Sequence, residues 1–443
     1  MNINLKKALR KKLKDNREQQ AFYLTATSHL IKYFFYKNFR KNRCLIDPPS
    51  SFFYKYKKLA KYFSIPLLIV GRYLKKKNIL ISVNNICNFS TGHIYGEINQ
   101  LKRLQKLNDQ YMNSKIWFIT SRKEILGETH HVFESKNFKV LFGGLKRVFF
   151  TFVAIKYPAI SIDGSIGHDN YILSNRPLSH RIVYHSSEKK KARLDYRSLE
   201  FYPIKERLIH YQDKKDMLHS QLNISSKYIV LQIKTIDDNA TVELINPDVY
   251  LDSIRYFQNK GYDVVLAGRE VCPKVFLDNN VVDYANSNYA STLNDFLLVG
   301  HCSLVISSAS GFALLVESLD KPLLVINSAH IMGPFGRRTI IIPVLLAIGE
   351  KIFNAKIQYR YICTYGFDLR KIFKDIRINH MPTKEEVLEG AIELEKMLFD
   401  RVPPLTSLQK EICDNGGCPK FTDGLSRISD FYLKKHRNFF DKQ

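Results

Sequence analysis

Residues 302–317 read CSLVISSASGFALLVE, and the pattern of this stretch indicates how the surrounding chain folds. The run Ser303–Ser307 is mostly apolar and short, which predicts a buried strand, and Gly311–Leu319 predicts a helix. The loop between them contains only small residues, namely Ser307, Ser308, Ala309, Ser310 and Gly311. A buried strand followed by a short loop and a helix is the repeating unit of a parallel α/β sheet.

The same unit recurs before and after this stretch. We expect strands at Tyr228–Ile233, Asp263–Ala267 and Pro322–Ile326, and helices at Pro247–Lys260 and near Thr292–Gly300. The helix at 247–260 has clear ends, because Asn246 is a favoured N-cap, proline is favoured at the first helical position and Gly261 stops the helix. This alternation predicts a doubly wound, Rossmann-like domain over residues 216–400.

Another α/β region precedes it, over residues 78–215. Strands are predicted at Asn78–Val83, Ile116–Thr120, Val140–Phe142 and Ala159–Ile162, with an amphipathic stretch from Ile94 to Leu107. This spacing favours a second Rossmann-like domain, and the charged residues 185–215 are interpreted as its end and a linker. The expected fold class is α/β, with two doubly wound domains that face each other across a cleft.

Residues 1–77 form a basic, aromatic-rich extension that we expect to be helical. The chain has a formal net charge of +26, and residues 1–80 hold 20 Lys/Arg against 3 Asp/Glu. Leu5, Leu9 and Leu13 share one helical face, and lysines surround them. Apolar stripes beside basic residues are typical of helices that bind an anionic membrane surface, which is the partner we expect here. The alternative is that these stripes pack against the body of the protein.

The cysteines indicate whether the chain forms disulfides or binds a metal, and the hydropathy of the sequence indicates where in the cell it is located. Seven scattered cysteines are typical of reduced thiols rather than a disulfide framework. Cys413 and Cys418 lack a second pair that would complete a zinc site. No Asp-x-Asp metal signature lies in a suitable place, so we expect no obligatory metal and no other cofactor. The sequence shows no signal segment and no apolar run of about 18 residues. We expect a cytoplasmic protein, peripheral at the inner face of the cytoplasmic membrane.

The small-residue loop at 307–311 is typical of a phosphate site. The free N–H groups and the positive dipole end of the helix point at the loop, and small side chains let a phosphate approach the main chain. Ligands of open α/β sheets bind at the carboxyl ends of the strands. We therefore expect Ser307, Ser308, Ser310 and Gly311 to bind a diphosphate. The alternative is a tight turn with an N-cap.

Three charged residues complete the predicted donor site. Lys234 directly follows the strand at 228–233, and Arg269 follows the strand at 263–267. Either cation is placed to neutralise a leaving diphosphate. Glu317, on the helix after the loop, has a carboxylate that accepts hydrogen bonds from a ribose diol. The alternative for each of the three is a solvated surface charge.

Candidates for the acceptor side lie in the first α/β region. His93 and Glu97 occur in Thr91-Gly-His-Ile-Tyr-Gly-Glu97, and their spacing of four places them on one helical face. Asp163 occurs in the glycine-rich Ser161-Ile-Asp-Gly-Ser-Ile-Gly-His168. An imidazole or a carboxylate suits a base that takes the proton of an attacking hydroxyl. Helix capping and a turn aspartate are the alternatives.

Together these motifs resemble the GT-B glycosyltransferases, and more narrowly a family of bacterial glycosyltransferases encoded with surface-polysaccharide genes (lipopolysaccharide, O-antigen, capsule). The residues that carry the resemblance are Gly92-His93 with Glu97, Gln232-Ile-Lys234, Ile245-Asn-Pro-Asp248, Gly261-Tyr-Asp-Val-Val265, the Ser307–Gly311 loop with Glu317 and Lys321-Pro322, and Ser426-Arg-Ile-Ser-Asp-Phe431. The resemblance implies that the C-terminal domain binds the donor without a metal. Residues 401–443 show a loop and a helix but no strand, and the resemblance implies that this helix crosses back to the first domain.

We therefore expect a glycosyltransferase that moves a sugar from a nucleotide sugar to a saccharide or lipid-linked acceptor in surface-polysaccharide synthesis. Two alternatives stay open. One is an epimerase-like enzyme that acts on nucleotide sugars with the same fold, and the other is a basic nucleic-acid-binding protein without catalysis. No nucleic-acid motif supports the second alternative, so we expect no nucleic-acid partner.

Overall fold

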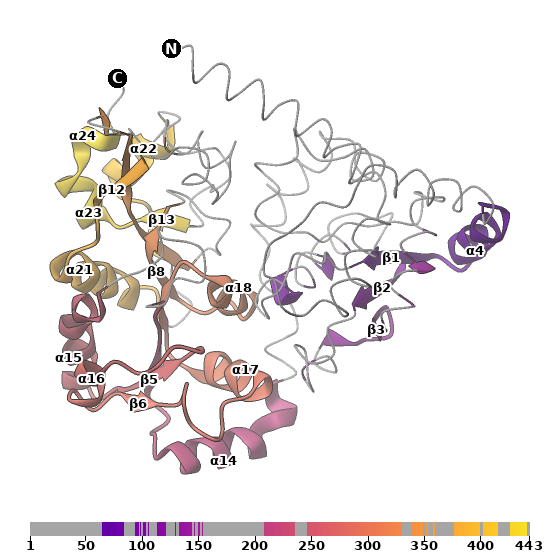
Figure 1. Ribbon diagram of the computed structural model, residues 1–443, viewed down its shortest axis with the longest axis horizontal. Coiled ribbons are helices and arrows are strands. Elements are labelled where there is room, and N and C mark those ends of the chain that lie inside the picture. Colours follow the sequence, from indigo (N-terminus) through magenta and orange to yellow (C-terminus); the bar gives the residue numbers. More distant parts are fainter. Residues whose placement is uncertain are drawn as a thin grey trace, which may run out of the picture.

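The structure is a computed structural model. It describes residues 64–83, 113–120, 133–143, 208–234, 246–329, 338–348, 376–398, 402–414 and 426–440, with shorter stretches between 94 and 153 and between 351 and 358. Figure 1 shows a larger α/β unit, which contains most of the labelled helices, and a smaller unit formed around strands β1, β2 and β3.

The larger unit is built on a seven-stranded sheet whose pairings are all parallel. Its strands are β4 (Tyr228–Gln232), β5 (Asp263–Ala267), β6 (Val282–Asp283), β7 (Val305–Ser308), β8 (Leu323–Ser328), β9 (Thr339–Pro343) and β13 (Ser426–Ile428). Across the sheet they lie in the order β13-β9-β8-β7-β4-β5-β6. The chain therefore starts in the middle, builds outward to β6 and then returns to the other side of β4. The predicted doubly wound sheet is confirmed.

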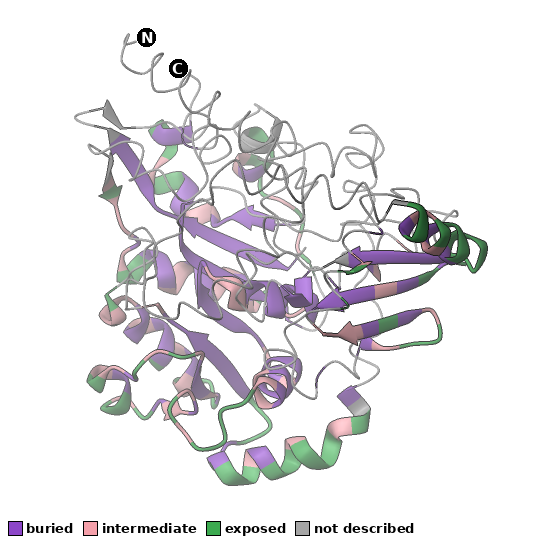
Figure 2. Cartoon of the chain, turned by 45° about the vertical axis from the view of Figure 1, so that its right-hand side comes forward, coloured by how far each residue is buried: buried purple, intermediate pink, exposed green. Residues whose placement is uncertain are grey.

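Apolar side chains that alternate along the strands form a core on each face of this sheet. Along β4, Tyr228 and Val230 belong to one core, and Ile229 and Leu231 to the other. Helices α17 (Thr292–His301) and α18 (Gly311–Ser318) cover the first face, and α15 (Leu251–Asn259) and α21 (Lys384–Glu395) cover the second. Figure 2 shows the central strands buried between these layers.

The local signals in the sequence predicted these elements well. The predicted strands that fall on described residues agree with the structure to within two residues at either end. The helix at 247–260 begins as the 3-10 turn η4 (Pro247–Tyr250), and the side chain of Asn246 caps it by accepting from the N–H of Asp248 at 3.0 Å. Gly261 ends the helix with φ +77°, a conformation that favours glycine. The strand predicted at Ala159–Ile162 lies outside the described residues.

The smaller unit has three parallel strands in the order β1 (Ile79–Val83), β2 (Lys115–Thr120) and β3 (Phe138–Phe142). Helix α4 (Ser64–Lys76) packs Leu67 and Leu74 on one face of this sheet. Buried residues of the predicted amphipathic stretch pack on the other face, among them Ile94, Ile98 and Leu101. Both faces of the small sheet are therefore covered.

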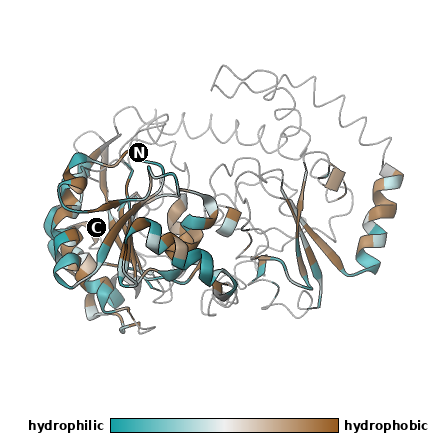
Figure 3. Ribbon diagram, turned by 90° about the horizontal axis from the view of Figure 1, so that it is seen from below, coloured by the Kyte–Doolittle hydropathy of each residue, from teal (hydrophilic) through white to brown (hydrophobic). Residues whose placement is uncertain are grey.

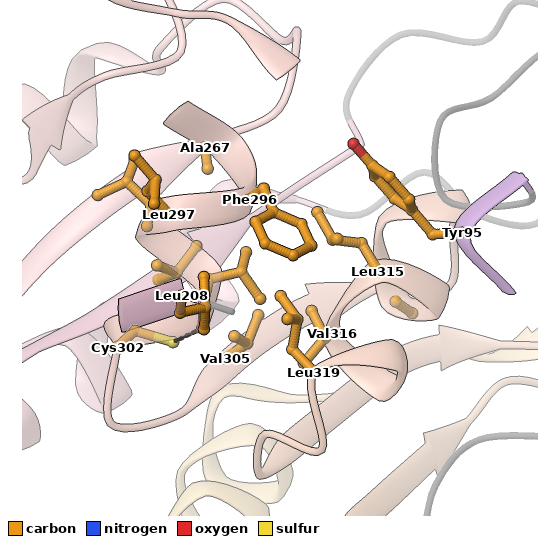
Figure 4. Close-up of a cluster of buried hydrophobic side chains, with 14 of the residues drawn as sticks. Tyr95, Leu208, Ala267, Phe296, Leu297, Cys302, Val305, Leu315, Val316 and Leu319 are labelled. Atoms are coloured by element: carbon orange, nitrogen blue, oxygen red, sulfur yellow. Dashed lines mark hydrogen bonds between the residues drawn. The ribbon is translucent and has the colours of Figure 1, made fainter. Parts of the chain in front are cut away.

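Aromatic side chains join the two units. Between ring centroids, Tyr95 of the smaller unit lies 5.2 Å from Phe133 and 5.9 Å from Phe296 of α17. The Tyr95 hydroxyl also forms a hydrogen bond of 2.8 Å with the hydroxyl of Thr129. Figure 4 shows Tyr95 and Phe296 in one apolar cluster with residues of α18, including Leu315. The smaller unit is thus packed against α17 and α18.

A small antiparallel sheet follows β9, and the sequence did not predict it. Strand β10 (Leu345–Ile348) pairs with β11 (Lys351–Ile352) and with β12 (Ile376–His380). The buried side chain of Gln358 accepts from the N–H of Leu346 at 2.9 Å and donates to the carbonyls of Ala329 and Val344. Gln358 thereby ties this sheet to the ends of β8 and β9.

The C-terminal tail differs from its prediction. We expected residues 401–443 to lack a strand and their helix to cross back to the first domain. Instead, β13 pairs with β9 at the edge of the large sheet, and helices α23 (Asp430–Lys435) and α24 (Arg437–Phe440) pack into the α15/α21 core. The sequence did not predict β13 because this strand has only three residues, Ser-Arg-Ile, and so shows no apolar run. Arg427 is nevertheless buried, and its guanidinium donates to the carbonyl of Pro403.

Two predicted domain boundaries also cut through packed structure. The boundary at residue 77 separates α4 from the sheet that it covers. The boundary at residue 215 cuts helix α14 (Gln212–Leu222), which follows η3 (Ile209–Tyr211) and packs on the α17/α18 side. The larger unit already includes Leu208, because the Leu208 side chain packs directly against Gly300 of α17. A Cβ added at Gly300 would lie 2.7 Å from it. Short helices α16 (Lys274–Leu277) and α22 (Ser407–Asp414) complete the described elements of this unit.

The placement of the tail predicts a stability effect. Leu433→Ala should lower the free energy of unfolding by about 2–5 kcal/mol, because Leu433 on α23 is buried in the α15/α21 core. Lys434→Ala, one residue further along and exposed, is the matched control and should change stability little. Urea denaturation followed by circular dichroism measures both. Equally small effects would show that α23 does not pack on the larger unit.

Candidate functional site

The order of the large sheet creates one place where the direction of winding reverses, between β4 and β7. The chain covers one face of the sheet with α15 after β4, and the opposite face with α18 after β7. In open α/β sheets, ligands bind at such a switch point, outside the carboxyl ends of the strands. The described residues that directly follow β4, β5 and β7 therefore make up the candidate site.

Gln232 bonds the two sides of this switch point together. Its side-chain Oε1 accepts hydrogen bonds from the hydroxyl of Ser307 at 2.7 Å and from that of Ser310 at 3.1 Å. Its side-chain nitrogen donates to the carbonyl of Ile233 at 2.6 Å. One glutamine thus links the end of β4 to the end of β7 and to the start of α18.

Ser307 and Ser308 are both strand residues, so the strand ends one residue later than the predicted end at Ser307, and Ser308 does not belong to the loop. Strand β7 runs to Ser308, and both side chains are fully buried. The Ser307 hydroxyl bonds to Gln232, and the Ser308 hydroxyl forms a hydrogen bond of 3.1 Å with the hydroxyl of Tyr250. These two hydroxyls fix the strand end from which α18 starts, rather than face a ligand.

Ser310 and Gly311 form the part of the predicted phosphate loop that reaches the surface. Ser310 is the N-cap of α18, and its hydroxyl accepts from the N–H of Phe312 at 3.2 Å. Ser310, Gly311 and Phe312 are partly exposed, whereas Ala313–Ser318 is buried. The positive end of the α18 dipole therefore lies at the surface, where it stabilises an anion.

The two predicted cations lie at the same edge of the sheet. Lys234 follows β4 and is partly exposed. Arg269 is exposed and follows Gly268, where the chain turns with φ +109°. A Cβ added at Gly268 would lie 3.3 Å from the side chain of Gln232, so the loop after β5 runs close beside that glutamine. The carboxyl edge thus brings together Lys234, Arg269, Ser310 and Gly311.

Asp295, in the first turn of α17, is a charged neighbour of Arg269 that the sequence did not reveal. It accepts a hydrogen bond of 3.0 Å from the hydroxyl of Tyr284. Burial raises the pKa of Asp295 to about 6, against the lowering effect of the Arg269 charge. Acidic residues are common in the first turn of a helix, where they interact with the helix dipole. The sequence around Asp295 therefore does not distinguish it from an ordinary helix residue.

Glu317 does not lie at the start of α18. Its side chain is 7% exposed, so the alternative of a solvated surface charge is wrong. It follows Gly311 by six residues, which corresponds to about 9 Å along the helix axis. Glu317 therefore lies less than two turns beyond Gly311 on α18, and its role as the ribose ligand stays a prediction.

The three predicted acceptor-side residues, His93, Glu97 and Asp163, lie outside the described residues. The structure does describe Ile94 and Tyr95, between the first two of these, and both are fully buried. Tyr95 contacts Phe296 of α17, with 5.9 Å between the ring centroids.

One group of described residues has the composition of a metal site, namely His380, Glu386 and His436. Burial raises the pKa of Glu386, but hydrogen bonds from both histidines and from the N–H of Thr383 outweigh this effect and hold the pKa well below its usual range. The sequence did not reveal the group, because its members are 6 and 50 residues apart and lie on three different elements. None of them belongs to the switch point.

No protein-family model matches the sequence, and no curated protein sequence matches it either. Several solved structures are similar. A glycosyl transferase family 9 protein from Veillonella parvula is 12% identical, with a TM-score of 0.42 over 72% of this chain and 96% of that chain. E. coli ADP-heptose LPS heptosyltransferase II is 13% identical, with a TM-score of 0.40 over 72% and 98%. E. coli heptosyltransferase WaaC with ADP-2-deoxy-2-fluoro heptose is 12% identical, with a TM-score of 0.37 over 60% and 92%.

Proposed function

We propose that the protein is a glycosyltransferase that moves a sugar from a nucleotide sugar to a saccharide or lipid-linked acceptor in bacterial surface-polysaccharide synthesis. The observation that supports this most is the switch point of the large sheet. There the exposed start of α18 lies at the same edge as Lys234 and Arg269. A helix N-terminus together with two cations matches the charge of a diphosphate.

In this proposal, main-chain N–H groups of Ser310 and Gly311 bind the donor diphosphate. Lys234 and Arg269 neutralise the charge that develops on the diphosphate as it leaves. The larger unit is then the donor domain, and the transfer needs no obligatory metal, because these groups supply the positive charge.

The acceptor binds on the smaller unit in this proposal, across a cleft between the two domains. His93, Glu97 or Asp163 takes the proton of the attacking hydroxyl. The contact of Tyr95 with Phe296 supports this arrangement, because Tyr95, which lies between His93 and Glu97 in the sequence, packs against α17 of the proposed donor domain.

The test is to incubate the full chain with a panel of nucleotide sugars and to measure binding by calorimetry and turnover by product analysis. The proposal predicts binding of at least one nucleotide sugar and slow release of its free sugar in the absence of acceptor. A changed sugar that stays attached to the nucleotide would identify an epimerase instead. Failure of the whole panel to bind would contradict the proposal.

A pair of substitutions at Gly311 tests the main-chain contact. Gly311→Pro removes one N–H at the first helical position, where proline is tolerated, and Ser310 already has the extended backbone that precedes proline. The loss of one hydrogen bond to a charged group should weaken nucleoside-diphosphate binding about tenfold to a hundredfold. Gly311→Ala keeps the N–H and is the matched control. Equal affinities of the two variants would show that this N–H does not bind the ligand.

Helix α4 supports the predicted membrane partner. Ile65, Ile69 and Tyr73 are spaced by four and are 69%, 60% and 57% exposed, beside exposed Arg72 and Lys76. Figure 3 shows the apolar and polar sides of this helix. Among the described residues, no helix combines the length and hydropathy that a membrane span requires. We propose that α4, together with the preceding basic residues, binds the anionic inner face of the cytoplasmic membrane.

Replacing two residues of this stripe should weaken membrane binding. Ile65→Ser combined with Ile69→Ser should lower the affinity for anionic vesicles about tenfold, because two exposed apolar side chains no longer enter the interface. Met217→Ser is the matched control, since Met217 is 60% exposed on α14 of the larger unit. Co-sedimentation with phosphatidylglycerol vesicles measures both. Sedimentation of the double variant at the level of the control would rule out this face.

A further inference from the structure

We propose that His380, Glu386 and His436 bind one divalent transition-metal ion, with zinc as the best match. His380 is the last residue of β12, Glu386 lies in the first turn of α21, and His436 is the C-cap of α23. Their ligand atoms all lie within 4.8 Å of one another. The site shares no residue with the proposed donor site and does not depend on the proposed function.

The Glu386 carboxylate lies between the two imidazoles. Its Oε2 is 2.9 Å from Nε2 of His380, and its Oε1 is 2.8 Å from Nε2 of His436. Two atoms that bind one zinc ion at about 2.1 Å, at angles of about 90–110°, lie about 3.0–3.4 Å apart. The observed spacings are a few tenths of an ångström shorter, so a small outward movement of the two rings admits an ion.

The surroundings hold these ligands in place. The side chain of Glu386 is fully buried, and those of His380 and His436 are 22% and 15% exposed. Oε2 of Glu386 also accepts from the N–H of Thr383 at 2.9 Å, as part of the capping box that starts α21. The ring of Tyr432 lies 4.4 Å from the ring of His436, between centroids. The hydrogen bond from Thr383 to the Glu386 carboxylate is an outer contact of the kind that orients the ligands of protein metal sites.

The ligand set selects the class of metal. Two histidines and one glutamate form a known ligand set for zinc, with a fourth position left for water. Imidazole also suits iron, nickel and copper, whereas magnesium and calcium prefer oxygen ligands. Zinc is the best match because it imposes little geometric preference of its own on a site assembled from three elements.

Lys435 is the competing cation. Its Nζ lies 3.4 Å from Oε1 of Glu386 and 2.9 Å from Oε2 of Glu385. When a metal ion binds Glu386, the ammonium keeps the shorter of these two contacts. Lys435 therefore lowers the affinity for metal without occupying the space between the imidazoles.

An ion held by all three ligands would join the C-terminal helix α23 to α21 and to the end of β12. Helix α23 follows β13, the edge strand of the large sheet. The metal therefore cross-links the C-terminal helix α23 to the larger unit, and metal binding should raise the melting temperature of the protein.

The test uses the full chain, purified without a histidine tag and stripped with a chelator. After titration with Zn²⁺, the protein should hold about one tightly bound ion per chain, and Zn²⁺ but not Mg²⁺ should raise the Tm. His380→Gln and His436→Gln should each weaken binding about 100-fold or more, because even outer contacts of a metal ligand are worth about 10–100-fold. His210→Gln, at an exposed position of η3, is the matched control and should bind like the wild type.

Two further measurements do not depend on the stability of the histidine variants. Co²⁺ bound to the wild-type chain should show ligand-field absorption without a thiolate charge-transfer band, because no ligand is a cysteine. Lys435→Ala should bind Zn²⁺ more tightly than the wild type, since it removes the competing cation. A wild-type Tm that Zn²⁺ does not change, a thiolate band, or unchanged affinity in both histidine variants would each overturn the proposal.

Discussion

The hydrogen bonds that Gln232 accepts from Ser307 and Ser310 link the end of β4 to the end of β7 and to the start of α18, at the point where the winding of the large sheet reverses. Strands β4 and β7 are neighbours in the sheet, but Gln232 and Ser307 are 75 residues apart in the chain. These buried side-chain bonds therefore fix the end of β4 relative to the start of α18. Gln232 contacts both the start of α18, through Ser310, and the turn at Gly268 that precedes Arg269. The proposed diphosphate site is therefore built around this glutamine.

A second constraint is the aromatic contact between the units. Phe296 of α17 packs against Tyr95 and Phe133 of the smaller unit, and α17 also carries Asp295, whose pKa is affected by the charge of Arg269. Arg269 thus belongs to the donor edge and also interacts with the helix that supports the smaller unit. In the proposed enzyme, α17 therefore contacts the smaller unit through Phe296 and the donor edge through Asp295.

The sequence predicted the elements whose signals are local. The strands around residues 228–328 are apolar runs, and the helix at 247–260 has its capping residues in place, so periodicity and caps were sufficient. Elements defined by distant partners were missed. Strand β13 contains Arg427 and becomes a strand only because the edge of β9 is open to it. In the candidate site, the sequence placed Lys234, Arg269 and Gly311 correctly at the carboxyl edge. It could not show that Ser307 and Ser308 turn inward, because their partners Gln232 and Tyr250 lie far away in the chain.

The central claim is that a nucleoside diphosphate binds at the start of α18, and a crystal structure of the chain with bound nucleoside diphosphate tests it most directly. We expect phosphate oxygens within hydrogen-bonding distance of the main-chain nitrogens of Ser310 and Gly311, with Lys234 or Arg269 in contact with the same phosphates. A nucleotide bound at any other edge of the sheet, with the start of α18 covered by protein side chains, would contradict it.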